Sequence, residues 1–386
     1  MINSLLVCSD TYPTPDDPAF SFVGQLCEAI SRNGVSITVV SPQSYTNHLV
    51  RGYPLHPRNR NYKVEGGETI TVLQPYTITF GQRFKKINSL IFKLVMGRTI
   101  KKHKDGVGAF YAHFWHNGYH LYPFALKYGK PLFVATGEET ILLGRTELIS
   151  DKSEFASFVK GVVCVSSKNK NESVELGLTV PGKCEVFPNS IDSNLFRKLN
   201  KLELRKKYGF DQDAFIVAFV GWFIDRKGPQ RVADAISKLD DLDVKSFFIG
   251  KESHTENIVP ECPGILYRGE VMHDKLPDYL NMADVFVLPT LSEGCCNAII
   301  EAMACGLPII SSNRPFNWDV LNDNNSIMVD PLNVDEISNA IRTMYEDREL
   351  CSKMSKAALD TAEELTLDIR AKKILDFINA KMDKDE

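Results

Sequence analysis

The residues best suited to chemistry lie between Pro289 and Ile310, where two glutamates, Glu293 and Glu301, stand eight positions apart. Glu293 follows an apolar run that reads as a strand, and Glu301 lies about two turns into a helix expected to begin near Cys296. The first N–H groups of a helix lack intrahelical partners and attract anions, whereas carboxylates accept hydrogen bonds from neighbouring hydroxyls. The segment therefore predicts a site for a ligand that carries both sugar hydroxyls and phosphates.

A second motif, FVGWFIDRKG, ends at Gly228. We expect a strand to end at Gly221 and a helix to begin just past Gly228, because Pro229 suits a first helical turn. Lys227 would then stand at a helix N-terminus, where its ammonium group can reach a diphosphate held by backbone dipoles.

These motifs require strands and helices in alternation, and short apolar runs do alternate with amphipathic stretches along the chain. The first set of predicted strands is Ser4–Cys8, Val35–Val40, Ala109–Ala112, Leu132–Ala135, Gly161–Val165 and Cys184–Phe187. The second set is Phe215–Phe219, Val244–Ile249, Ile265–Tyr267, Val285–Leu288, Pro308–Ile310 and Ile327–Val329. At 386 residues the chain is long enough for two such domains, and this order predicts a doubly wound parallel sheet in each.

The segment Pro289–Ile310 resembles the donor-binding signature of retaining glycosyltransferases of the GT-B fold, in particular family 4 (glycosyl transferases group 1). The residues that match are Glu293, Glu301, Ala302, Met303, Ala304, Gly306 and Pro308, and in the crossing between the two sets Asn189, Ile191, Asp192 and Phe196. The resemblance implies an α/β protein with two Rossmann-like doubly wound domains facing across a cleft. It places an acceptor-binding domain at 1–190, a nucleotide-sugar donor domain at 191–365, and at 366–386 a helix that returns to the first domain.

The resemblance also implies roles for single residues. Glu301 would hold the ribose, Lys227 the departing diphosphate, and Glu293 the sugar. The backbone contacts to the donor would come from Gly294, Cys295, Cys296, Asn297, Gly221, Val271 and Met272. The family usually has an arginine five residues before the lysine, where this chain has Trp222. Arg226 either supplies the missing charge or points elsewhere.

The first domain departs further from the family. His113 ends a predicted strand and is expected to face the cleft, with His116 a weaker candidate. Glu138 stands where the family commonly has a histidine that meets the donor sugar; it could accept a sugar hydroxyl, act on the acceptor, or indicate a changed donor or lost activity. Ser21 either hydrogen-bonds a ligand or simply begins a helix.

Composition excludes several other classes. The net charge of −4 gives no basic field for nucleic acid, and no cysteine or histidine cluster predicts a metal, so we expect no metal and no cofactor beyond the UDP- or GDP-linked substrate. The N-terminus lacks the basic region of a signal peptide, and no apolar run is long enough to span a bilayer. We therefore expect a protein of the cytoplasm or of the inner face of the cell membrane.

The segment Gly81–Lys104 carries eight Lys and Arg residues and no acid. One interpretation is a basic amphipathic helix on an anionic membrane, with Phe84, Ile87, Ile91, Leu94 and Val95 on its apolar side. The other is a helix docked on its own sheet with a solvated basic face. The membrane interpretation would fit an acceptor carried on a lipid diphosphate.

The resemblance, taken with these features, implies a retaining, metal-independent glycosyltransferase that moves a sugar from a nucleotide-diphosphate sugar to a glycan or lipid-linked glycan acceptor in bacterial cell-envelope polysaccharide synthesis. One alternative is a GT-B subunit that binds a nucleotide sugar or a partner without transfer. Trp222 and Glu138 favour this alternative, because they replace residues that the family usually has. The other is a GT-B epimerase or hydrolase of nucleotide sugars.

Overall fold

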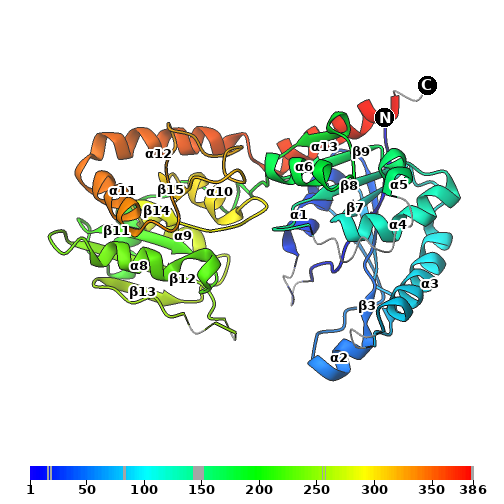
Figure 1. Ribbon diagram of the computed structural model, residues 1–386, viewed down its shortest axis with the longest axis horizontal. Helices are drawn as coiled ribbons and strands as arrows, with labels where there is room; N and C mark the ends of the chain where they lie inside the picture. The colour runs from blue at the N-terminus through cyan, green and yellow to red at the C-terminus, as the bar shows by residue number, and fades with distance from the viewer. Residues whose placement is uncertain are drawn as a thin grey trace. The chain divides into compact units, whose positions relative to one another are not determined.

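The computed structural model describes residues 1–14, 17, 20–80, 84–141, 152–253, 255–256 and 258–383. The chain divides into two compact units (Figure 1). Unit 1 comprises residues 1–165, 169–187 and 367–386, and unit 2 comprises residues 166–168 and 188–366. Each unit is built on its own sheet, and each is described separately.

The sheet of unit 1 has eight strands in the order β10-β9-β8-β7-β1-β2-β5-β4. Its strands are β1 (Ser4–Cys8), β2 (Ser36–Val40), β4 (Asn59–Lys63), β5 (Thr69–Leu73), β7 (Ala109–His113), β8 (Leu132–Thr136), β9 (Gly161–Cys164) and β10 (Cys184–Val186). All neighbours are parallel except β4, an antiparallel edge strand. Strands β7 and β8 are buried throughout, as their continuous apolar sequence requires in a sheet covered on both faces.

Helices cover both faces of this sheet. They are α1 (Ser21–Ser31), α3 (Lys85–His103), α4 (Trp115–Tyr128), α5 (Lys152–Phe158), α6 (Ser167–Glu175) and α13 (Leu367–Met382), with a short 3₁₀ turn at Pro181–Lys183. One buried apolar cluster includes residues of α1 and α13, and the other includes residues of α3 and α4. A small element of α2 (Tyr45–Arg51) and the paired strands β3 (Gln43–Ser44) and β6 (Tyr76–Thr77) contacts α3.

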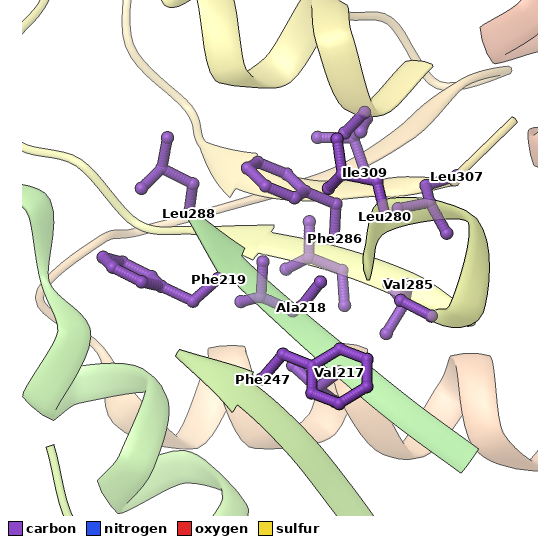
Figure 2. Close-up of a cluster of buried hydrophobic side chains, with 14 of the residues drawn as sticks. Val217, Ala218, Phe219, Phe247, Leu280, Val285, Phe286, Leu288, Leu307 and Ile309 are labelled. Carbon is purple, nitrogen blue, oxygen red and sulfur yellow. The ribbon is translucent and has the colours of Figure 1, made fainter. Parts of the chain in front are cut away.

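Unit 2 has six parallel strands in the order β13-β12-β11-β14-β15-β16. They are β11 (Phe215–Val220), β12 (Val244–Ile249), β13 (Ile265–Gly269), β14 (Val285–Leu288), β15 (Ile309–Ser312) and β16 (Ser326–Val329). The helices are α7 (Lys201–Tyr208), α8 (Pro229–Ser237), α9 (Leu276–Met282), α10 (Asn297–Ala304), α11 (Val334–Glu346) and α12 (Arg348–Glu363). Figure 2 shows part of its core, in which Phe219, Phe286 and Ile309 come from three neighbouring strands.

The strand orders place one topological switch point in each unit. From β1 the chain proceeds to β2 on one side, whereas β7 leads to β8 on the other, so the order reverses between β1 and β7. In unit 2 the order reverses between β11 and β14 in the same way. Ligands of doubly wound sheets bind outside the carboxyl ends of the strands at such points. We therefore expect ligands to bind at the loops after these four strands.

Helix α4 begins at Trp115, so that His116 and Asn117 lie in its first turn. The expected apolar side of the basic helix needs correction. On α3 the exposed apolar residues are Ile87, Leu90 and Leu94, whereas Ile91 and Val95 are only half-exposed. Residues 81–83 of the basic segment lie outside the described residues. Within the described ranges, no helix combines the length and the apolar character needed to cross a bilayer.

Candidate active site at the switch point of unit 2

The loops after β11 and β14 bring the charged residues of both sequence motifs together. After β11 the chain forms a 3₁₀ turn at Asp225–Lys227, and Gly228 with φ 77° then starts α8 with Pro229 in its first turn. Glu293 lies in the loop that joins β14 to α10. Because β11 and β14 are adjacent, Lys227 and Glu293 meet at the switch point.

One carboxylate oxygen organises this cluster. Oε1 of Glu293 lies 2.5 Å from Nζ of Lys227 and 2.9 Å from Nη1 of Arg226. It also accepts a hydrogen bond of 2.8 Å from the hydroxyl of Thr290. The Arg226 side chain thus points at the same carboxylate as Lys227 and not away from the cluster. Two cations and one anion leave the cluster with an excess of positive charge.

Two glycines lie at the strand ends next to Lys227. A Cβ atom on Gly221 would lie 3.5 Å from Cδ of Lys227, so the lysine stem packs directly over the end of β11. A Cβ on Gly250, at the end of β12, would meet the carbonyl oxygen of Gly221 at 1.8 Å, so only glycine fits there. The Lys227 stem thus packs on Gly221, and Gly250 allows the backbone of Gly221 to approach the end of β12 closely.

Burial works against the charge of Lys227 by lowering its pKa, but the Cys296 sulfur and the Glu293 carboxylate lie close, and the pKa ends above its usual value. Burial raises the pKa of the Cys296 thiol, which is therefore neutral at pH 7. The carboxylate of Glu293 is then the negative group that keeps this nearly buried lysine charged. A bound diphosphate would supply the same kind of negative charge.

Glu301 lies on α10, on the same unit. Its carboxylate is largely buried and lies 3.3 Å from Nε2 of His273, a residue of the loop after β13. The His273 ring also packs edge-on against Phe196, with ring centroids 5.2 Å apart. The hydrogen bond to Glu301 raises the pKa of His273, against the opposing effect of burial. His273 thus holds the carboxylate that was predicted to bind a ribose.

The donor loop leads directly into α10, whose N-cap residue is Cys296. The side chain of Cys296 makes no cap hydrogen bond, and the helix has no acidic residue in its first turn, so its N-terminus keeps its attraction for an anion. Asn189 anchors the loop by donating to the carbonyl of Cys295 at 3.0 Å and to Oδ1 of Asn297 at 2.8 Å. Gly294 is buried and lies outside the left-handed region, so the turn there does not depend on a positive φ.

The remaining predicted donor residues flank this cluster. Val271 is half-buried against the core, and Met272 next to it is 73% exposed. Trp222, which replaces the family's arginine, directly follows Gly221 and is 55% exposed. Sequence reasoning missed Thr290 and His273; the only signal for His273 was its place beside the expected base contacts at Val271 and Met272.

Three residues that the sequence suggested as site candidates, His113, Glu138 and Ser21, lie in unit 1. His113 is buried at the end of β7, its Nε2 has no hydrogen-bond partner among the described residues, and burial with the nearby Arg370 lowers its pKa to about 3. Both oxygens of Glu138 accept hydrogen bonds: Oε1 from the backbone N–H of Trp115, and Oε2 from Thr136 and Gly137. Glu138 therefore caps the N-terminus of α4. Ser21 is the exposed first residue of α1, and Phe20 occupies the N-cap position.

No group of three or more His, Cys, Asp or Glu side chains in the described part of the chain is arranged to hold a metal ion. That the reaction needs no metal stays a prediction.

Comparison with known proteins shows what the unit that holds this site is similar to. Residues 200–361 match the model of the family described as "Glycosyl transferases group 1". A Bacillus subtilis (strain 168) glycosyltransferase named for teichuronic acid biosynthesis, TuaC, is 24% identical over 373 residues, which are 90% of each chain. An Escherichia coli enzyme named UDP-Gal:alpha-D-GlcNAc-diphosphoundecaprenol alpha-1,3-galactosyltransferase is 26% identical over 49% of this chain and 52% of its own length.

Solved structures agree on the fold. Sucrose-phosphate synthase from Thermosynechococcus elongatus superposes with a TM-score of 0.76 at 15% identity, over 99% of this chain and 100% of that one. HepE from Anabaena, solved in complex with UDP-glucose, gives a TM-score of 0.69 at 14% identity over 98% and 99%. At these identities the likeness establishes the fold, which is GT-B.

Proposed function

We propose that this glycosyltransferase of group 1 transfers a sugar from a UDP- or GDP-linked donor to a glycan or lipid-linked glycan acceptor, with retention of configuration and without a metal ion. The observation that carries the proposal is the cluster of Lys227, Arg226 and Glu293 at the switch point of unit 2. Further support comes from Glu301 on α10 and from the N-terminus of that helix.

In this reaction the bond between the anomeric carbon and the diphosphate oxygen breaks, and the diphosphate leaves with the electron pair. Lys227 and Arg226 offset the charge that develops there, which is commonly the largest single contribution to catalysis. The acceptor oxygen forms the new bond on the same face and loses its proton. The departing phosphate oxygen, which lies on that face, takes this proton. Glu293 holds sugar hydroxyls, Glu301 the ribose, and the backbone near Val271 and Met272 the base.

The envelope role rests on the relatives' names and on the surface of unit 1. Ile87, Leu90 and Leu94 are 46–58% exposed on one stripe of α3, whereas Met96 and Ile100 on the opposite side are fully buried. Apolar residues of and after α2 are exposed as well, among them Leu49, Val50 and Tyr53. We propose that this surface, with the lysines of α3, rests on the anionic inner face of a cell membrane and gives access to a lipid-linked acceptor.

Donor binding is tested by calorimetry with UDP and with GDP on the purified protein. We expect one of the two to bind, and Glu301→Ala to weaken it at least tenfold, because a charge-assisted hydrogen bond contributes ~1.5–3 kcal/mol. Glu349→Ala, on the exposed surface of α12 in the same unit, is the matched control and should bind like the wild type. Equal affinity in both variants would remove Glu301 from the donor site.

A further inference from the structure

Unit 1 has a switch point of its own, between β1 and β7, and it also carries a hydrogen-bonded carboxylate. Asp10 lies in the loop after β1, and His116 lies in the first turn of α4, after β7. Nε2 of His116 is 2.5 Å from Oδ1 of Asp10. The arrangement matches that of unit 2, where Glu293 and Lys227 meet across the corresponding pair of strands.

The carboxylate of Asp10 is held in place and still reaches solvent. Besides His116, the side chain of Asn117 lies 3.4 Å from Oδ1, and Asn117 is itself fixed by donating to the carbonyl of His113 at 2.8 Å. The His116 side chain is only 15% exposed, whereas that of Asp10 is 42% exposed.

Two aromatic rings follow one another from His116, the partner of this carboxylate, and both belong to residues with strained backbones. Phe20 (φ 60°) and Phe114 (φ 71°) are the two non-glycine residues of the described chain with positive φ. Phe114 also has ψ 152°, a region that is nearly restricted to glycine. Its ring lies 6.1 Å from that of Phe20 and 6.2 Å from that of His116. The fold thus maintains an unfavourable backbone at the point where it sets half-exposed phenylalanine rings next to the Asp10–His116 pair.

A carboxylate beside aromatic faces suits a sugar. The carboxylate accepts hydrogen bonds from hydroxyl groups, and the negative face of an aromatic ring attracts the weakly positive C–H groups of a pyranose. It does not suit a phosphate, because Asp10 carries the same sign of charge. The residues proposed to hold the donor are all in unit 2. The ligand of unit 1 is therefore the other substrate of the transfer.

We propose that Asp10 accepts a hydrogen bond from a hydroxyl group of the glycan acceptor, and that His116 is the positioning residue that orients the carboxylate. The inference rests on the proposed function, since it requires that a sugar acceptor exists. No proton passes through the pair, because the departing diphosphate already takes the acceptor proton. The rings of Phe20 and Phe114 form the apolar side of the same subsite.

The experiment uses the full chain, the radiolabelled sugar nucleotide whose nucleotide binds, and a chloroform–methanol extract of bacterial membranes as the acceptor probe. We expect Asp10→Asn to raise the extract concentration needed for half-maximal transfer about tenfold. His116→Gln, which can still donate to Asp10, should have a smaller effect of the same kind. Asp368→Asn removes an acid paired with Arg32 elsewhere in unit 1 and serves as the control.

Nucleotide affinity, measured by calorimetry, should stay within twofold of the wild type in all three variants. The same measurement shows that each variant is folded. If Asp10→Asn does not fold, His116→Gln provides the test. Unchanged dependence on extract in Asp10→Asn overturns the inference and leaves the proposed function standing. Equal losses of nucleotide affinity and transfer overturn it too, because they would assign Asp10 to the donor site. A wild type that binds nucleotide but transfers nothing to the extract defeats the proposed function and, with it, this inference.

Discussion

At the scale of single residues, Glu293 holds both cations that are expected to stabilise a departing diphosphate. The arrangement keeps Lys227 charged and directs Lys227 and Arg226 at one carboxylate oxygen before any ligand arrives. Preorganised charges of this kind need not rearrange during the reaction, and so they act mainly on the transition state.

Lys227→Ala should therefore lower kcat by about 100-fold or more while KM for the donor changes only a few-fold, because the lysine acts on charge that develops as the diphosphate leaves. Arg226→Ala should show a weaker effect of the same kind. Lys238→Ala, an exposed lysine of the same unit that pairs with Asp335, should behave like the wild type. A rise in KM with kcat intact would limit Lys227 to ground-state binding.

The His273–Glu301 pair predicts a dependence of stability on pH. Its hydrogen bond to Glu301 raises the pKa of His273, so the pair stabilises the fold below pH ~6.5 and loses this effect as the pH rises through the raised pKa. Because the histidine is 58% exposed, we expect at most ~0.5 kcal/mol. His273→Asn should lower the melting temperature by about 1–2 °C at pH 5.5 and by nothing measurable at pH 9. His103→Asn is the control, and a difference that grows with pH would contradict the pairing.

At the scale of elements, the sequence indicated the site of unit 2 because Glu293 and Lys227 each follow an apolar strand, and parallel strands end at one edge of a sheet. It did not indicate the start of α4. The residue that caps this helix, Glu138, comes from beyond the next strand, and a helix N-terminus stabilised from so far along the chain has no local signal. The same holds for His273, which meets Glu301 through the sheet order and not through sequence spacing.

Helix α3 is expected to bind anionic membranes through its whole exposed surface and not through one contact. Binding to anionic vesicles should gain about 1 kcal/mol per lysine near the surface. Lys101→Ser with Lys102→Ser should therefore weaken sedimentation with vesicles that contain phosphatidylglycerol, and raising the salt concentration should do the same. Lys372→Ser with Lys373→Ser removes an exposed pair from α13 in the same unit and should change nothing. Equal binding to neutral vesicles, or no binding to either kind, would mean that the basic face of α3 is simply solvated.

At the scale of the whole molecule, each of two doubly wound units presents a carboxylate at its switch point, one paired with cations and one with a histidine beside aromatic rings. The two chemistries complement each other, since one suits a sugar diphosphate and the other a neutral glycan. The alternation of apolar runs was enough to predict the six strands of unit 2 and six of the eight strands in the sheet of unit 1, but it missed β5. It was not enough to predict the antiparallel edge strand β4, because alternation in a half-exposed strand does not specify its direction.

The measurement that tests the central claim most directly follows a radiolabelled sugar from its nucleotide, with and without the membrane lipid extract. The account predicts that label enters extractable lipid and free nucleoside diphosphate is released only when the extract is present, and that Lys227→Ala slows both by about 100-fold or more. Donor binding without any turnover would make the chain a binding subunit, and donor turnover that ignores the extract would make it a hydrolase or an epimerase. Either result would contradict transfer to an acceptor.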